Sequence, residues 1–333
     1  MEEIVVANLQ LSLACSDNPR TRPIIEGRIK PDGIDLQVTI LHPSEMFWRQ
    51  LHFEEFDVSE MSLSSLLMTV ANGDTRWVGL PVFTSRRFFH TGVLVTAQSG
   101  IEKPEDLKGK RIGVPEYQQT AALWARAALQ QLYDIRAQDM RWWMERTEER
   151  SHGSATGFKP PADIEFHYVP EEKNLGSMLA GGELDASLLY IANNNLVDRS
   201  RIDFSNDPRV RPLFPNARGE GIAYYQKTGF YPVNHGMVVR RKVADQHPWV
   251  PLNIFNAFSA AKDLVNDEAR RAAAPYVETG MAESAGFGKD LFPYGVKSNQ
   301  ELLTAITRFS NDQGLTPRVL SLEEVFAPQT LEL

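Results

Sequence analysis

The sequence contains very little cysteine and no long apolar run. Cys15 is the single cysteine among 333 residues, which excludes an intrachain disulfide and a CxxC-type zinc site. No stretch approaches the roughly 18–20 consecutive apolar residues that a membrane helix needs, so we expect no membrane association. No Lys or Arg precedes Arg20, whereas a secretory signal needs a basic segment followed by an apolar core. The sequence therefore predicts a cytoplasmic protein.

The usual nucleotide-binding and catalytic motifs are missing as well. There is no GxxxxGK[ST], GxGxxG or GxSxG pattern, which leaves nucleotide binding and a serine-hydrolase elbow without their marks. The seven histidines form neither an HExxH pattern nor a close His/carboxylate triplet, so we expect no metal site.

The charge balance is acidic, with 35 Lys and Arg against 43 Asp and Glu and a net charge of −8. Without a basic block, such a chain lacks the phosphate-neutralising surface of a nucleic-acid binder. Its length indicates roughly two domains, since single cores stop growing at about 250–300 residues. These features point to a globular protein that handles a small molecule.

Strand-like and helix-like segments alternate in the first part of the chain. The patterns predict strands over residues 4–13, 34–41, 56–61 and 76–83, with Cys15 buried after the first, and helices over 44–51 and 62–71. The rhythm restarts with strands over 91–96, 111–114, 164–169 and 184–190, and helices over 118–133 and 175–180. Residues 141–161 read as a long loop. A strand over 235–241 is followed by helices over 248–266, 267–278 and 299–312.

This alternation predicts an α/β fold of two lobes, because strands that alternate with helices form parallel sheets. We expect a discontinuous first lobe of residues 1–90 and 242–333 and a second lobe of residues 97–234. Residues 91–96 and 235–241 would be two crossing strands that join the lobes.

Polar side chains gather at the predicted strand-to-helix turns, where ligands bind in open α/β sheets. Ser62 and Ser64 stand at a helix start, where free N–H groups attract anions, although serine is also an ordinary N-cap. Arg86, Arg87 and His90 share the next turn. An arginine fork matches a carboxylate, although a solvated loop has the same composition.

Two further side chains are candidates for acid–base chemistry. Glu116 stands before the 118–133 helix, either as a base or hydroxyl-binding group or as an acid that complements the helix dipole. His235 begins the second crossing strand and would lie near a cleft between the lobes. A purely structural histidine fits that position equally well.

Several segments resemble the 4,5-dihydroxyphthalate decarboxylase family. The most specific are PEYQQTAALWAR at residues 115–126 and FPYGV at residues 292–296, and the resemblance extends from about Leu11 to Pro328. The chain departs from the family pattern at residues 189–195 and 145–161. The resemblance implies a fold like a type II periplasmic binding protein, with two α/β lobes, two crossing strands and the ligand in the cleft.

The resemblance also implies an activity and a partner. It indicates cofactor-independent removal of one carboxylate from 4,5-dihydroxyphthalate, a small aromatic dicarboxylic acid, to give protocatechuate. A non-catalytic solute-binding protein for an aromatic acid, or a decarboxylase of another hydroxylated aromatic acid, are the alternatives. The sequence leaves a homo-oligomer open.

The implied reaction assigns roles to the polar candidates. A ring hydroxyl para to the leaving carboxylate lets an acid protonate the ring carbon before CO₂ departs, which avoids an aryl carbanion. We expect His90 or His235 as that acid, Glu116 at the phenolic end, and Arg86 with Ser62 and Ser64 on the remaining carboxylate. The further candidates are the secondary clamps Arg20 and Arg87 and the lining residues Tyr117, Thr120 and Tyr294.

Overall fold

The computed structural model describes residues 7–283 and 290–333. Its strands are β1 Leu9–Cys15, β2 Ile34–Ile40, β3 Val58–Ser62, β4 Trp77–Arg86, β5 Leu94–Thr96, β6 Arg111–Val114, β7 Arg141–Met144, β8 Glu165–Tyr168, β9 Ala186–Ser187, β10 Val210–Pro212 and β11 Val233–Arg240. Its α-helices are α1 Arg22–Ile25, α2 Pro43–Phe53, α3 Leu63–Ala71, α4 Thr120–Tyr133, α5 Gly153–Thr156, α6 Leu175–Ala180, α7 Ala217–Thr228, α8 Arg241–Gln246, α9 Val250–Glu278, α10 Gln300–Asp312 and α11 Leu322–Val325.

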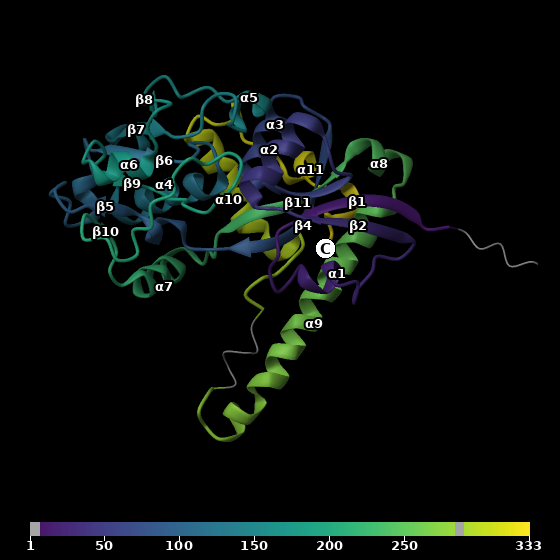
Figure 1. The fold of residues 1–333 in the computed structure, drawn as a ribbon. Coiled ribbons are helices and arrows are strands. Elements are labelled where there is room, and N and C mark those ends of the chain that lie inside the picture. Colours follow the sequence, from purple (N-terminus) through teal and green to yellow (C-terminus); the bar gives the residue numbers. More distant parts are fainter. Residues whose placement is uncertain (1–6, 284–289) are drawn as a thin grey trace, which may run out of the picture.

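Two separate sheets organise the molecule (Figure 1). The first has five strands in the order β2-β1-β3-β11-β4, and the second has six in the order β10-β5-β9-β6-β7-β8. The alternating segments predicted from the sequence therefore form sheets of the expected α/β kind. Cys15 is buried at the end of β1, as expected.

The first sheet is completed by a strand from far along the chain. β1 runs parallel to β2 and β3, whereas β11 inserts antiparallel between β3 and β4. This pairing sets His235 opposite Ser62 on one side and Ser85 on the other. Residues more than 170 positions apart in sequence are thereby brought to the same edge of the sheet.

The second sheet contains a strand that the sequence did not reveal. Residues 141–161 were expected to be a loop, and this expectation is wrong in part, because β7 and α5 lie within them. In β7, Trp142 and Met144 are buried while Arg141 and Trp143 are half-buried, which is the period-two pattern of a strand. β7 pairs in parallel with β6 and β8.

The helices near the C-terminus also differ from expectation. The two helices expected over 248–266 and 267–278 are one continuous helix, α9. Asp267, whose type suggested a new helix start, instead pairs with Arg270 one turn later, and the alanines that follow favour continuation. The first half of α9 packs on the body and the second half projects away from it (Figure 1).

The two expected crossing segments, residues 91–96 and 235–241, fall in different sheets. β5 belongs to the second sheet and β11 to the first, so each expected crossing segment is a strand of one sheet. The division itself, with boundaries at residues 90 and 242, stays a prediction. Residues 4–6 of the first expected strand lie outside the described residues.

Candidate active site

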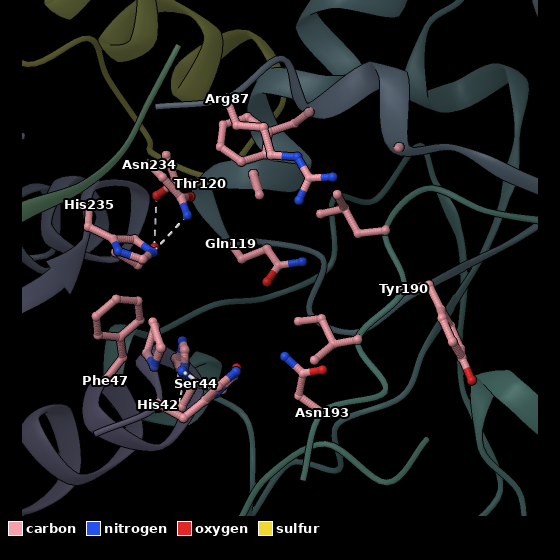
Figure 2. A pocket seen from close by; sticks show the side chains of 18 of the residues that line it. His42, Ser44, Phe47, Arg87, Gln119, Thr120, Tyr190, Asn193, Asn234 and His235 are labelled. Atoms are coloured by element: carbon pink, nitrogen blue, oxygen red, sulfur yellow. Dashed lines mark hydrogen bonds between the residues drawn. The ribbon is translucent and has the colours of Figure 1, made fainter. Parts of the chain in front are cut away.

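A cavity of about 330 Å³ is lined by strand ends of the first sheet and by loops and helix starts around both sheets. Its lining comes from the start of α2, the ends of β3 and β4, the start of α4, the loops after β7 and β9, and the start of β11 (Figure 2). The lining residues are His42, Pro43, Ser44, Phe47, Ser62, Arg87, Phe89, Gly92, Gln119, Thr120, Ala121, Arg146, His152, Leu189, Tyr190, Ile191, Ala192, Asn193, Asn234 and His235. This volume is at the small end of ligand sites and suits a single-ring molecule.

His235 lies at one wall of the cavity and is held by two hydrogen-bonding partners. Its Nδ1 lies 3.1 Å from Glu60 Oε2, and its Nε2 lies 2.7 Å from Asn234 Nδ2. Glu60 is fully buried and accepts hydrogen bonds from the backbone and hydroxyl of Ser16. A carboxylate at Nδ1 fixes the tautomer in which Nε2 is the acceptor, and it compensates the charge when Nε2 takes up a proton in place of the Asn234 hydrogen bond.

Phe47 supplies an aromatic surface beside this histidine. Its ring contacts the rings of His235 and His152 edge-on, with centroids 4.8 and 5.9 Å apart. Together with the other apolar lining residues, this ring offers a surface on which a planar ligand can pack.

Free hydrogen-bonding groups face the middle of the cavity. Figure 2 shows the guanidinium of Arg87 and the amides of Gln119 and Asn193 pointing into the open space. Arg87 makes no side-chain hydrogen bond or ion pair among residues 7–283 and 290–333, and Gln119 Nε2 is buried without a partner in that same part of the chain. An unpaired guanidinium beside unpaired amides suits a carboxylate.

Two hydroxyls connect the lobes at the cavity wall. Ser62 Oγ and Thr120 Oγ1 lie 2.9 Å apart, and Thr120 Oγ1 also accepts from the backbone N–H of Ser64. The Ser64 hydroxyl itself is buried, and Ser64 is not among the described residues that line the cavity. Ser62 and Thr120 thus line the same cavity as Arg87 and His235.

A charged network is centred on Arg146, which also lines the cavity. Arg146 is 1% exposed, and its guanidinium donates to Glu116 Oε2 and Asp198 Oδ1, each at 2.7 Å, and to Ser44 Oγ at 2.8 Å. Burial disfavours this charge, but the two carboxylates outweigh burial and raise the pKa of Arg146. Glu116 also accepts from Gln118 and Ser151. It is fully buried, and no atom of it lines the cavity within the described structure.

His90, the other predicted acid, lies outside the cavity. It is fully buried against the rings of Phe214 and Tyr224, with centroids 6.0 and 5.1 Å away. Neither ring nitrogen has a hydrogen-bond partner within the described structure, although Glu220 Oε1 lies 3.5 Å from Nε2. Burial lowers the pKa of His90 to about 4, so its imidazole is neutral at neutral pH.

Four other predicted site residues are engaged elsewhere. Arg86 donates to the carbonyls of Tyr231 and Pro293 and to Asn299, and burial lowers its pKa to about 10. Arg20 donates to the carbonyl of Thr84 and stacks on a phenylalanine ring. Tyr294 is buried and Tyr117 lies under the guanidinium of Arg126, both away from the cavity lining of the described chain.

The structure also adds side chains that the sequence did not single out. Glu60 stands in a turn that was noted only for its serines, and Gln119 stands beside Thr120 in a turn noted for Glu116. His42, Phe47 and Asn193 had no local signal, because only the packing of α2 and of the loop after β9 turns them toward the cavity.

The sequence has close relatives among characterised proteins. It is 33% identical over 333 residues to a Comamonas testosteroni protein named 4,5-dihydroxyphthalate decarboxylase, a match that covers 98% of this chain and 99% of that protein. The chain belongs to the 4,5-dihydroxyphthalate decarboxylase family. A Pseudomonas putida protein of the same name is 40% identical over 229 residues, which covers 69% of this chain and 86% of that protein. The resemblance noted from the sequence, and the expected identity as a carboxy-lyase, are confirmed at the level of this family; no family model matches the chain.

Solved structures confirm the fold class. The alkanesulfonate-binding protein SsuA of Xanthomonas axonopodis pv. citri, bound to MOPS, superposes with a TM-score of 0.54 at 15% identity, with 98% of both chains covered. The desulfurization enzyme DSZB superposes with a TM-score of 0.52 at 16% identity, again with 98% of both chains covered. The chain therefore has the two-lobed fold of type II periplasmic binding proteins, which does not by itself fix a function.

Within 7–283 and 290–333, none of the helices combines the length and apolar character needed to cross a membrane. The same part of the chain contains no group of three His, Cys, Asp or Glu side chains arranged to hold a metal ion.

Proposed function

We propose that this chain removes one carboxylate from 4,5-dihydroxyphthalate to give protocatechuate and CO₂, without a cofactor. Family membership supports the substrate and the reaction. The observation that carries the proposal is the joint presence in one small cavity of His235, backed by Glu60, and of Arg87 without a partner in the described chain.

The reaction needs a proton at the ring carbon that bears the leaving carboxylate. In our proposal the substrate hydroxyl para to that carbon loses its proton to solvent, and the resulting phenolate pushes electron density into the ring. Protonated His235 then gives its Nε2 proton to the ring carbon. The bond to the carboxylate breaks, its electron pair restores the aromatic ring, and CO₂ leaves. The phenolate and His235 each regain a proton from solvent, so one proton is consumed in each turnover.

The remaining carboxylate needs a fixed cationic partner. Arg87 is suited to this role, with Gln119 and Asn193 as additional donors and Ser62 and Thr120 on the wall beside His235. Such contacts hold the ring carbon within reach of His235, and fixed geometry of this kind contributes strongly to rate. Glu116 accepts from Arg146 and is not among the described residues that line the cavity, so in our proposal it does not contact the phenolic end of the substrate.

The test is to incubate the purified protein with 4,5-dihydroxyphthalate and to measure CO₂ and protocatechuate. Phthalate, which lacks both hydroxyls, is the matched control substrate and should release no CO₂. Turnover that survives exhaustive chelation supports a metal-independent reaction, and its loss would contradict that part of the proposal. Stabilisation of the protein by the substrate without product would instead support a solute-binding role.

A further inference from the structure

His42 caps the first turn of α2 and lines the same cavity wall as Phe47 and His235. Its Nδ1 accepts a hydrogen bond from the backbone N–H of Ser44, at 3.3 Å. A neutral imidazole that accepts at Nδ1 carries its proton on Nε2. Figure 2 shows His42 and Phe47 close together on the side of the cavity that also carries His235.

We propose that His42 is a neutral Nε2–H donor that binds the ionised ring hydroxyl of the substrate, at the end of the ring opposite to the carbon that His235 protonates. The inference rests on the proposed function. Both histidines line the cavity with Phe47, and in this proposal a ring that packs on Phe47 turns one para position toward each imidazole. A charge-assisted hydrogen bond to a phenolate is among the strong hydrogen bonds in proteins.

The surroundings of His42 keep it neutral. Burial lowers the pKa of His42, and Arg146 and His235 act in the same direction, while Asp198 and Glu45 oppose them. The N-terminal end of α2 also disfavours a cation there. A histidine whose acceptor nitrogen is taken by a helix N-terminus can polarise an oxygen as a neutral donor, which leaves His235 as the group that changes protonation state.

Asparagine at residue 42 separates capping from donation. It is among the best N-cap residues, so His42→Asn should keep α2 intact while its shorter side chain withdraws the donor from the cavity. His167→Asn is the matched control, because His167 is exposed and pairs with Glu165.

The experiment measures the ultraviolet spectrum of protocatechuate bound to each protein as pH is varied, together with kcat on 4,5-dihydroxyphthalate. In the wild type and in His167→Asn, the bound hydroxyl should ionise about one pH unit lower than in His42→Asn, in keeping with the loss of one hydrogen bond to a charged group. The kcat of His42→Asn should fall about tenfold.

Identical ionisation curves and an unchanged kcat in His42→Asn would overturn the inference while leaving the proposed function standing. A wild type that neither turns over 4,5-dihydroxyphthalate nor binds protocatechuate would overturn both. If His42→Asn unfolds at ordinary temperature, asparagine does not preserve the cap, and His42→Gln is assayed in the same way. A His42→Gln protein in which bound protocatechuate ionises as in the wild type supports the inference, because the glutamine amide can donate. A His42→Gln protein that binds protocatechuate more weakly but shows no change in its ionisation counts against it.

Discussion

His235 and His90 are both almost completely buried, yet the structure surrounds them with opposite chemistry. His235 has a carboxylate at Nδ1, an amide at Nε2 and a cavity in front of it. His90 has aromatic rings around it and no hydrogen bond at either nitrogen within the described residues. Burial with a hydrogen-bonded carboxylate and an open face suits proton transfer, whereas burial among rings, with the Glu220 carboxylate 3.5 Å from Nε2 and not hydrogen-bonded to it, suits packing. The contrast shows that burial does not mark a catalytic histidine.

The neighbouring arginines repeat this contrast. The guanidinium of Arg86 donates hydrogen bonds to two backbone carbonyls and to the side chain of Asn299 within the protein. Arg87 is exposed at the cavity, and its guanidinium is left free by the described residues around it. Arg86 at the end of β4 thus holds the fold, whereas Arg87, the residue just after the strand, is available to a substrate.

The largest expected effect separates the two histidines by activity. His235→Gln should lower kcat on 4,5-dihydroxyphthalate about 10²- to 10⁴-fold, the usual contribution of a general acid. His90→Phe, which fills an aromatic site, should keep kcat within a few-fold. Steady-state kinetics on both variants decides the matter, and the reverse pattern would place the acid at His90.

A second experiment tests His90 through the pH dependence of the free energy of unfolding, because its substitution should have little effect on activity. Because its folded-state pKa is about 4, below the ordinary 6.5, the unfolded chain takes up a proton first as pH falls. The stability that His90 contributes is therefore complete above about pH 6.5 and is lost progressively toward pH 4, on the order of 3 kcal/mol. Urea unfolding at pH 7 and pH 4.5 should show a smaller loss for His90→Phe than for the wild type. An equal loss in both proteins would show that His90 is solvated.

The arginine pair should divide in the same way. Arg87→Met should raise KM roughly 10- to 100-fold, the equivalent of one charge-assisted hydrogen bond, with little change in the midpoint of unfolding. Arg86→Met should instead lower the unfolding midpoint, because it leaves buried carbonyls unpaired. Thermal melts and KM values for both variants are compared, and a raised KM for Arg86→Met without loss of stability would contradict this division.

The smallest effect concerns the residue behind His235. Glu60→Gln keeps an acceptor near Nδ1 but removes the charge that compensates an imidazolium, so we expect kcat to fall about tenfold with KM little changed. An unaltered kcat would mean that Glu60 supports the fold through Ser16 and has no influence on His235.

Much of the fold could be predicted from the sequence because strand and helix periodicity is local. The helix over 175–180 appears with its expected bounds as α6, and strand 34–41 appears as β2 with one residue fewer. The strand β7 was not predicted, because a four-residue strand followed directly by Glu145 and Arg146 has little room to show a period. The continuity of α9 was not predicted, because Asn266 and Asp267 are typical of a helix start. The alanine-rich sequence that follows outweighs this signal.

The site could be predicted only in part. Ser62, Arg87, Thr120 and His235 meet at the cavity because the turns at the sheet edges converge there. The choice between Arg86 and Arg87 could not be made, since the pairing of β11 with β4 shifts register on both sides of His235. Such irregularities change which side chain faces a cavity, and sequence alternation does not reveal them.

The most direct test of the site is to observe which imidazole meets the ligand. The protein is labelled with ¹⁵N at the histidine rings, and protocatechuate is added while the ring nitrogen signals, assigned with the His235→Gln and His90→Phe variants, are followed. We expect the Nε2 signal of His235 to shift on binding and both signals of His90 to stay unchanged. A shift of His90 with His235 unmoved would contradict the assignment of this cavity as the active site.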